Sequence, residues 1–365
     1  MSRHLAWLFS GVVMVAMSAP LQALSYEVGG CKTGVGYVNF TTISAAVAGV
    51  PAGSKIQVCP GAYPEQLTIT QPLTLQGIAS NNSNRAAITI NPTGGLAPNV
   101  TSSIGQGLYA QVLVQNVNPP GPVNITGITV DGGGGNVGCS TRVGLVGIFY
   151  AAGTSGTINE VTTRNHQSSG CGNSIWAENT AGATQIIRIE NSSVRNFDNW
   201  GITALSDQNT STLTAIINAN FVNPASTALA VNAEGMVGSI ANNVVTSAGE
   251  GILTEAFAGP ITVSGNTVAD VIGGYGMFVS DGTTATSNKL SNMNDAFNFP
   301  DGGATVKSNV VTNITGAAFD LGCFTGSTIS ANIVNDSQFG FQYSRSPITG
   351  NSLYNVDTVL SGSCP

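Results

Sequence analysis

The chain has 365 residues, of which 46 are glycine and only 8% are charged, and its formal net charge is −7. Such an acidic surface repels nucleic acid, so we expect no nucleic-acid partner. It also repels uronic-acid polymers unless cations bridge the charges. Many glycines with few charges suit a fold of short strands and turns rather than one of long helices.

The first residues predict export. They combine Arg3, an apolar run over residues 5–17 and Ala23 as the cleavage point, a pattern typical of a secretory signal peptide. We therefore expect residues 1–23 to be a signal peptide and residues 24–365 to form one domain of a secreted or periplasmic protein. No later apolar run has the length of a transmembrane helix.

The stretch TTISAAVAGVPAG predicts a short helix near the start of the mature chain. Ile43, Ala46, Val47 and Val50 follow helical spacing, and Thr42 is a suitable N-cap. A helix at this place would cover the open end of a stack of strands, which otherwise exposes unpaired edges.

An asparagine recurs through the second half of the chain, each time two residues before an aliphatic residue and 19–23 residues after the previous one. One period holds three short strand runs and no helical periodicity, which predicts one coil of a parallel β-helix. The asparagine would lie at a corner, where its amide bonds the next coil about 4.8 Å away. The asparagines are Asn220, Asn243, Asn266, Asn288, Asn309, Asn332 and Asn351.

A second register of apolar anchors lies at the centre of one strand in each coil. We expect the anchors to point inward and the alternate residues beside them to point outward. The two registers predict an all-β solenoid of about ten or more coils. The anchors are Ile148, Ile175, Ile202, Leu229, Ile252, Met277, Phe297, Phe319 and Phe341. The residues expected outside are Phe149, Trp176, Glu178, Thr203, Asn232, Leu253, Glu255, Phe278, Asn298, Asp320 and Gln342.

The mature chain opens with the expected helix and the strand runs VCPGAYPEQLTI and PLTLQG, and then enters the asparagine-cornered coils. This arrangement resembles right-handed parallel β-helix proteins of the pectate-lyase-like superfamily over nearly the whole mature chain. The resemblance implies a right-handed parallel β-helix with a short N-terminal capping helix. It implies no single activity, because that fold carries lyases, hydrolases, esterases, epimerases and non-catalytic surface proteins. The motifs of polygalacturonases, pectin methylesterases and alginate epimerases are absent from the sequence.

All six cysteines follow the expected signal peptide, and their number is even. In an exported chain this indicates up to three disulfides. Metal ligation is the alternative, but no CxxC spacing favours it. Sequential pairing would place each pair on neighbouring coils or in a cap, so we expect Cys31 with Cys59, Cys139 with Cys171, and Cys323 with Cys364.

Acidic residues follow the anchors on consecutive coils and predict an acidic stripe along one sheet edge. Glu178 and Asp207 are the candidate catalytic carboxylates. Glu234 and Glu255 are the candidate metal ligands, because a stripe of like charges repels itself unless a cation such as calcium neutralises it. The two aspartates of the stripe that precede glycine suit turns for backbone reasons alone. The full stripe is Glu178, Asp207, Glu234, Glu255, Asp281 and Asp301.

Basic and aromatic residues cluster at the N-terminal end of this stripe. Arg164 is the candidate base of a lyase mechanism, although a salt bridge is the alternative role. Trp176 and Trp200 are candidates to stack on sugar rings, and packing is the alternative for both. His166 and Arg195 complete the candidate substrate-binding set.

Two hypotheses follow from different classes of protein. The first is a secreted enzyme, a lyase or a glycoside hydrolase, that acts on polysaccharide along the outer face of one sheet. In it Trp176, Glu178, Asp207 and Arg164 meet on one exposed face, and calcium is the only cofactor expected. The second is a non-catalytic β-helix that binds glycan or serves as a surface or adhesion element. In either case we expect a monomer.

Overall fold

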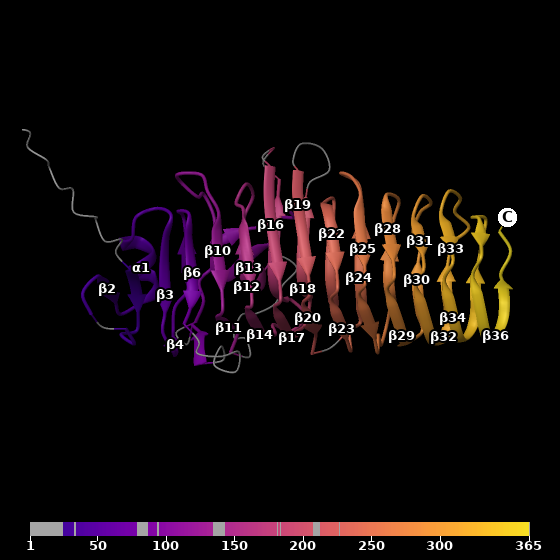
Figure 1. Ribbon diagram of the computed structural model, residues 1–365, viewed down its shortest axis with the longest axis horizontal. Helices are drawn as coiled ribbons and strands as arrows, with labels where there is room; N and C mark the ends of the chain where they lie inside the picture. Colours follow the sequence, from indigo (N-terminus) through magenta and orange to yellow (C-terminus); the bar gives the residue numbers. More distant parts are fainter. Residues whose placement is uncertain are drawn as a thin grey trace, which may run out of the picture.

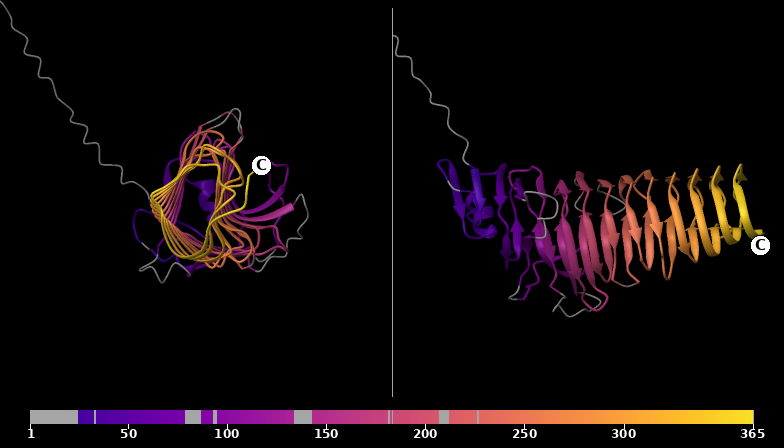
Figure 2. Two further views of the ribbon diagram at one scale, coloured as in Figure 1. Left: turned by 90° about the vertical axis from the view of Figure 1, so that its right-hand side faces the viewer. Right: turned by 60° about the horizontal axis from the view of Figure 1, so that its bottom comes forward.

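The protein is a single rod of stacked strands (Figure 1), and an end-on view shows the coils superimposed about one axis (Figure 2). It is a right-handed parallel β-helix, as expected. The signal-peptide segment, residues 1–23, and the candidate Asp207 lie outside the described part. The computed structural model describes residues 25–32, 34–78, 87–92, 95–133, 143–180, 182, 184–206, 212–225 and 227–364.

Each coil gives one strand to each of three parallel ladders. The first ladder comprises β1 (Ser25–Val28), β3 (Ser54–Val58), β6 (Leu73–Gly77), β10 (Val123–Thr126), β13 (Gly156–Asn159), β16 (Thr184–Glu190), β19 (Thr212–Asn218), β22 (Val237–Ala241), β25 (Ile261–Ser264), β28 (Thr283–Thr286), β31 (Thr305–Lys307), β33 (Thr328–Ser330) and β35 (Ile348–Thr349), with β2 (Tyr37–Phe40) beside β1.

The second ladder comprises β4 (Gly61–Tyr63), β7 (Ile88–Ile90), β11 (Thr129–Asp131), β14 (Thr162–His166), β17 (Ser193–Phe197), β20 (Phe221–Asn223), β23 (Val244–Thr246), β26 (Thr267–Ala269) and β29 (Lys289–Met293). The third comprises β5 (Leu67–Ile69), β9 (Gly107–Val114), β12 (Val143–Tyr150), β15 (Gly172–Asn179), β18 (Trp200–Ser206), β21 (Leu229–Glu234), β24 (Glu250–Glu255), β27 (Tyr275–Val279) and β30 (Asp295–Asn298). In the last coils one bent strand serves both ladders: β32 (Val310–Asp320), β34 (Ile333–Gln342) and β36 (Ser352–Ser361). The short β8 (Val100–Thr101) pairs antiparallel with β9.

The predicted asparagine ladder is confirmed at the corner between the first and second ladders. The backbone N–H and Nδ2 of Asn266 both donate to Oδ1 of Asn288 at 2.9 Å, and Nδ2 also donates to the Ile240 carbonyl at 2.9 Å. The same bonds join every step from Asn220 to Asn351. The ladder therefore satisfies the polar groups that the corner buries.

The turn itself falls on the residue before each asparagine. Gly265 has a φ of 66° and Ala331 a φ of 55°, so alanine as well as glycine takes the left-handed conformation here. The ladder also reaches one coil further than the asparagines. Ser192 donates its backbone N–H to Oδ1 of Asn220 at 3.0 Å, and its Oγ accepts from the N–H of Val161 at 3.2 Å. A serine thus replaces the amide where the ladder begins.

The interior is a continuous column of apolar side chains, as the anchors predict. Phe297, Phe319 and Phe341 stack nearly face to face, with ring centroids 5.3 and 5.2 Å apart. One anchor is wrong: Val231, not Leu229, stands in register with Ile202 and Ile252. Leu229 instead pairs with Trp200 at the start of the strand. The run LAV offers two apolar positions, and its sequence alone does not decide which one faces inward.

The N-terminal end is covered as expected. Helix α1 (Ile43–Gly49) begins after Thr42, whose Oγ1 accepts from the N–H of Ala45 at 3.1 Å. Ile43, Ala46 and Val47 are buried against the core. The helix therefore closes the first coil with the face that the spacing predicts.

Two of the expected disulfides are present, Cys31–Cys59 and Cys323–Cys364. Cys139 lies outside the described residues, so its bond to Cys171 stays a prediction. Within the described chain, one group of three potential metal ligands lies close together, Glu27 with Cys31 and Cys59. Both sulfur atoms of this group are already bonded to each other in the disulfide. No helix in the described chain is long and apolar enough to cross a membrane.

Candidate functional site

Towards the N-terminus, the outer face of the third ladder is covered by another segment of the chain. Trp176 points away from the coil interior, as predicted, but its side chain is 0% exposed. It lies in a second apolar cluster with Leu113, Val146 and Phe149, against which Val100 of β8 packs. Residues 95–106, which we call the covering segment, bring Val100 onto this face. The expectation of an exposed Trp176 is therefore wrong. The alternation of side chains along a strand predicts which way Trp176 points but not whether another segment covers it.

Glu178 fastens the covering segment. Its carboxylate accepts the backbone N–H of Ser103 at 3.1 Å and the Ser103 hydroxyl at 3.0 Å. Burial raises the pKa of Glu178, and the two Ser103 hydrogen bonds oppose that rise. Glu178 is thus engaged in a structural contact, and its proposed catalytic partner Asp207 is not among the described residues.

The two tryptophans lie together, as their sequence positions suggested. The rings of Trp176 and Trp200 meet edge to face at 5.1 Å, and Phe149 meets Trp176 at 5.8 Å. Trp200 is half-buried. With Trp176 fully covered, only Trp200 of this pair offers surface to a ligand.

The two candidate arginines lie on the second ladder, apart from Trp176 and Glu178. Arg164 and Arg195 stand in register there. Arg164 Nε donates to Oδ2 of Asp131 at 2.7 Å. Burial by itself would raise the pKa of Asp131, but hydrogen bonds from Gly133, Asn165 and Arg164 hold that pKa below its ordinary value. The predicted meeting of Trp176, Glu178 and Arg164 on one exposed face is therefore wrong.

Arg195 and His166 also have structural surroundings. Arg195 Nε donates to Ser193 Oγ at 2.6 Å, and its guanidinium lies 5.0 Å from the centre of the Phe221 ring. His166 is buried in register with Phe197, and its Nε2 is 2.7 Å from Oε1 of Gln111. Burial lowers the pKa of His166 to about 4, so the ring is neutral at physiological pH. A buried His166 presents no surface to substrate.

The outer face becomes accessible further along the rod. In register on successive coils lie Leu253, Phe278, Asn298 and Asp320, all of them half-buried. The Phe278 and Tyr275 rings lie 6.5 Å apart. We call this part of the third ladder, from β24 to β32, the open half.

Glu250 and Asp295 line one edge of the open half, where they are the first residues of β24 and β30. Burial, followed by the charges of Asp320, Asp295 and Glu250, raises the pKa of Tyr275. Asp295 is fixed by the Ala317 N–H, which donates to its Oδ1 at 2.7 Å. Burial also raises the pKa of Asp320; a hydrogen bond from Gly322 opposes this and the charge of Asp295 adds to it. The charges of three acids therefore add to the effect of burial on Tyr275.

The opposite edge carries the remainder of the predicted acidic stripe. Glu234 and Glu255 are paired in register. Burial, then the charges of Glu234 and Asp301, raise the pKa of Glu255. Oδ1 of Asp301 accepts the N–H of Asp281 at 2.8 Å. A shallow hollow of about 260 Å³ lies here, lined by Ala256, Phe257, Ser280, Asp281, Gly282 and Asp301.

The open half has no basic residue of its own. The strands β24, β27 and β30 contain no lysine, arginine or histidine. The ion pairs found in the described chain, Arg164–Asp131 and Arg188–Glu190, lie on other ladders. This face therefore combines an aromatic centre with two acidic edges and no built-in counter-charge.

Sequence reasoning identified part of this face and missed the rest. Phe278, Asn298 and Asp320 are outward residues that alternation predicts. Tyr275 and Asp295, which stand two residues before the anchors Met277 and Phe297, were missed. A signal was present in the sequence, because a polar or aromatic residue stands two positions before the anchor on three successive coils. Glu250, before Ile252, is the first of these.

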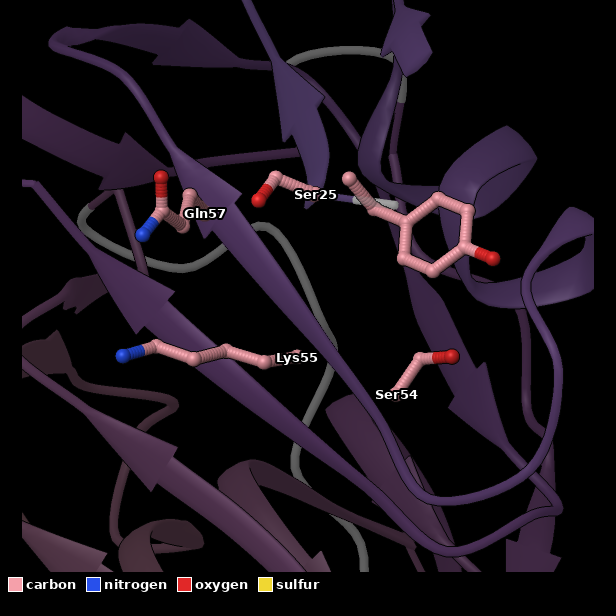
Figure 3. Close-up of a pocket in the computed structure, with 5 residues that line it drawn as sticks. Ser25, Ser54, Lys55 and Gln57 are labelled. Atoms are coloured by element: carbon pink, nitrogen blue, oxygen red, sulfur yellow. The ribbon is translucent and has the colours of Figure 1, made fainter. Parts of the chain in front are cut away.

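A second, smaller hollow lies on the outer face of the first ladder, near the N-terminal end (Figure 3). It is lined by Ser25 and Tyr26 of β1 and by Ser54, Lys55 and Gln57 of β3. In Figure 3 the side chains of Lys55 and Gln57 extend in the same direction from their strand. Its volume of about 140 Å³ is below that of ordinary ligand pockets. None of the predicted site residues lines it, and we assign it no role.

Comparison with known proteins gives similarity in structure alone. No family model matches the chain, and no curated protein sequence matches it. The structure is similar to a GH136 lacto-N-biosidase from Eubacterium ramulus, at 10% identity and a TM-score of 0.48, covering 93% of this chain and 68% of the other.

Two further solved structures are similar to it. A DFA-IIIase from Arthrobacter chlorophenolicus has 13% identity and a TM-score of 0.49, covering 81% of this chain and 83% of the other. PfbA, a surface adhesin of Streptococcus pneumoniae, has 13% identity and a TM-score of 0.39, covering 87% of both chains. At such identities and TM-scores, the fold assignment rests on the strand register and the function on the chemistry of the site.

Proposed function

We propose that the protein is an exported β-helix that binds a neutral polysaccharide along the open half of the third ladder. The observation that carries this proposal is the aromatic pair Tyr275–Phe278 on a face whose charged groups are all acidic. Aromatic faces stack on sugar rings and are costly to leave on a surface without a partner. The two disulfides favour an oxidising, extracytoplasmic location.

Each part of the face has a role in this proposal. Tyr275 and Phe278 stack on the rings of the glycan, while Asn298 and Asp320 bond its hydroxyl groups. Carboxylates on both edges repel polymers of uronic acid, and no cation offsets them on these strands. The chemistry therefore favours uncharged sugars.

Hydrolysis of the bound glycan is a second candidate function, and the surroundings of Asp320 favour it. Burial and the charge of Asp295 raise the pKa of Asp320, which is how a glycosidase keeps one carboxyl protonated as its general acid. Asp295, held by the Ala317 N–H, would act as the second carboxylate of such a pair. Binding without turnover, as in a surface or adhesion element, is the alternative.

We propose Glu234 and Glu255, which lie in register on neighbouring coils, as ligands of a calcium ion. The fit is partial. Among the described His, Cys, Asp and Glu residues, none adds a third ligand atom within 4.8 Å of those two carboxylates. Calcium would therefore need backbone, water or substrate oxygens for the rest of its shell. A rise in Tm on adding calcium but not magnesium, lost in Glu255→Gln, would support the site, and an unchanged Tm would contradict it.

The proposal is tested by calorimetry on the mature chain with a panel of neutral and uronic polysaccharides, with and without calcium. We expect binding to a neutral glycan and an affinity loss of about tenfold in Phe278→Ala, the value of one stacking contact. Phe221→Ala is the matched control, because Phe221 lies on the second ladder beside Arg195. Equal loss in both variants, or binding to uronic polymers alone, would contradict the proposal.

Turnover is tested on the same glycan by the release of reducing ends. Asp320→Asn should lower the rate by about a hundredfold or more while binding persists, because the amide cannot donate a proton as a general acid does. No reducing ends from any bound glycan would leave binding as the function and remove the hydrolytic candidate.

A further inference from the structure

Three buried polar atoms lie in one row on the outer face of the third ladder. They are Nε1 of Trp176 on β15, Oγ1 of Thr203 on β18 and Oδ1 of Asn232 on β21, and these residues are 0%, 0% and 2% exposed. The three residues stand in register on successive coils. Within the described chain, none of the three atoms has a hydrogen-bond partner. We call this set the unpaired row.

An unpaired row lowers the stability of the fold. A buried polar atom without a hydrogen bond has lost its bonds to water and gained none in return. Native structures hold few such atoms, and each of them needs a reason. A single one is weak evidence, because Oγ1 of Thr163 is also buried and unpaired. Three on adjacent coils of one outer face form a pattern, and a ligand that bonds them would explain it.

The chemistry of the unpaired row defines the kind of ligand that suits it. The indole N–H of Trp176 only donates, the amide oxygen of Asn232 only accepts, and the hydroxyl of Thr203 does both. None of the three atoms is charged. A matching ligand presents neutral groups that both donate and accept hydrogen bonds, as the hydroxyl groups of a sugar do.

The unpaired row is continuous with the open half. Asn232 stands in register with Leu253, and Leu253 with Phe278. At the other end of the row, Trp176 lies in the apolar cluster that the covering segment packs against. The row therefore joins the face proposed to bind glycan to the covered part of the same column.

Partly exposed apolar side chains stand beside the centre of the row. Trp200 and Leu205 flank Thr203 along β18, and both are half-buried. Both pack against the cluster that contains Trp176. A change of rotamer in these two side chains breaks no backbone hydrogen bond of the ladder, and partly exposed side chains make such changes rapidly. The row can thus be uncovered without unfolding a strand.

We propose that the unpaired row is a further sugar subsite, in which the hydroxyl groups of one neutral sugar residue bond Thr203, Asn232 and Trp176. Trp200 and Leu205 turn aside on binding, and the indole face of Trp200 then stacks on the sugar ring. This inference rests on the proposed function, because it extends the same binding face beyond β24 towards the covering segment.

Removal of one hydroxyl tests the subsite by calorimetry. Thr203→Val keeps the shape of the side chain and removes its unpaired group, so it should raise the Tm by about 1–3 °C. The same variant should weaken the binding of neutral glycan about tenfold. Thr163→Val is the matched control, because Thr163 is equally buried and unpaired but stands in register with Val130 and Val194 of the main core. It should raise the Tm in the same way and leave the affinity unchanged.

Tryptophan fluorescence gives an independent signal from the same place. Trp176 and Trp200 are the only tryptophans after residue 23, and Phe278 lies three coils from the strand of Trp200. Glycan should change the fluorescence of the mature chain at the concentrations at which calorimetry detects binding. Thr203→Val should move the midpoint of this titration about tenfold higher.

The outcomes separate this subsite from the proposed function. Suppose that the wild type binds a neutral glycan and loses affinity in Phe278→Ala. If Thr203→Val then binds as tightly as Thr163→Val, or if the fluorescence does not change, the subsite is overturned and the proposed function stands. If no neutral glycan binds, both fall. Should Thr203→Val fail to fold by circular dichroism, Asn232→Leu, which copies Leu253 on the next coil, should show the same tenfold loss, and an unchanged affinity would overturn the subsite.

Discussion

The two halves of the third ladder's outer face have the same strand arrangement, but one half is covered by another segment and the other is open to solvent. Phe149 and Trp176 lie under the covering segment and are buried, while Leu253 and Phe278 occupy the same column four coils on and remain partly exposed. The strands themselves do not differ in direction or register. The difference arises from one connection, the segment between β7 and β9 that folds back over the face.

This contrast distinguishes aromatic residues that stabilise the fold from those that we propose to bind a ligand. An aromatic residue on the covered half contributes to the free energy of unfolding, because its removal leaves a cavity. Under the proposed function, an aromatic residue on the open half contributes chiefly to binding, because solvent already reaches it. Three substitutions and one titration test this separation, and the change expected in stability decreases from the first to the last.

Trp176→Ala should lower the free energy of unfolding by about 3–5 kcal/mol, the usual cost of emptying a large buried site. Denaturant unfolding of the mature chain measures it. The two ring contacts of Trp176, with Phe149 and Trp200, would be lost together. A loss below about 1 kcal/mol would mean that the covering segment does not hold the ring in place.

His166 should make the covered half sensitive to acid. Its pKa is about 4 in the folded chain and near 6.5 when unfolded. Stability from this group is therefore complete above about pH 6.5 and is lost as pH falls toward 4, by roughly 3 kcal/mol in total. Unfolding measured across this range should be less pH-dependent in His166→Phe, which copies Phe197 in the next coil. An equal pH dependence in both chains would contradict the assignment.

Glu178→Ala should loosen the covering segment without unfolding the rod. It removes the hydrogen bonds from Ser103 but also relieves a buried carboxylate, so we expect a net local effect of about 1 kcal/mol. Hydrogen exchange at Ser103 and neighbouring amides should speed up about fivefold. Glu234→Ala, away from the covering segment, is the control and should leave that exchange unchanged.

Phe278→Ala should change stability least, by less than about 1 kcal/mol, because the ring is only partly buried. Measured beside Trp176→Ala in the same denaturant series, it gives the contrast between the two halves directly. A loss as large as that of Trp176→Ala would place Phe278 in the packing of the rod and remove the basis for its role in binding.

The coil architecture could be predicted because it is local and periodic. Asn266 and its counterparts recur once per coil, and each satisfies groups of its neighbours, so the period records the fold. Where a position offered two equivalent apolar residues, as at Leu229 and Val231, the period did not decide between them. The candidate site was less predictable, because Trp176 and Arg164 are close in sequence but lie on different ladders.

The repeat, the asparagine corner, the capping helix and, except around Leu229, the direction of side chains along the strands are readable from the amino-acid order, since each depends on spacing within one or two coils. Which outward residues meet solvent is settled only by tertiary packing. It depends on how residues 95–106, from one early connection, pack over Trp176 and bond Glu178 seventy-five residues away. A contact at such separation leaves no period in the sequence, because a single segment makes it once.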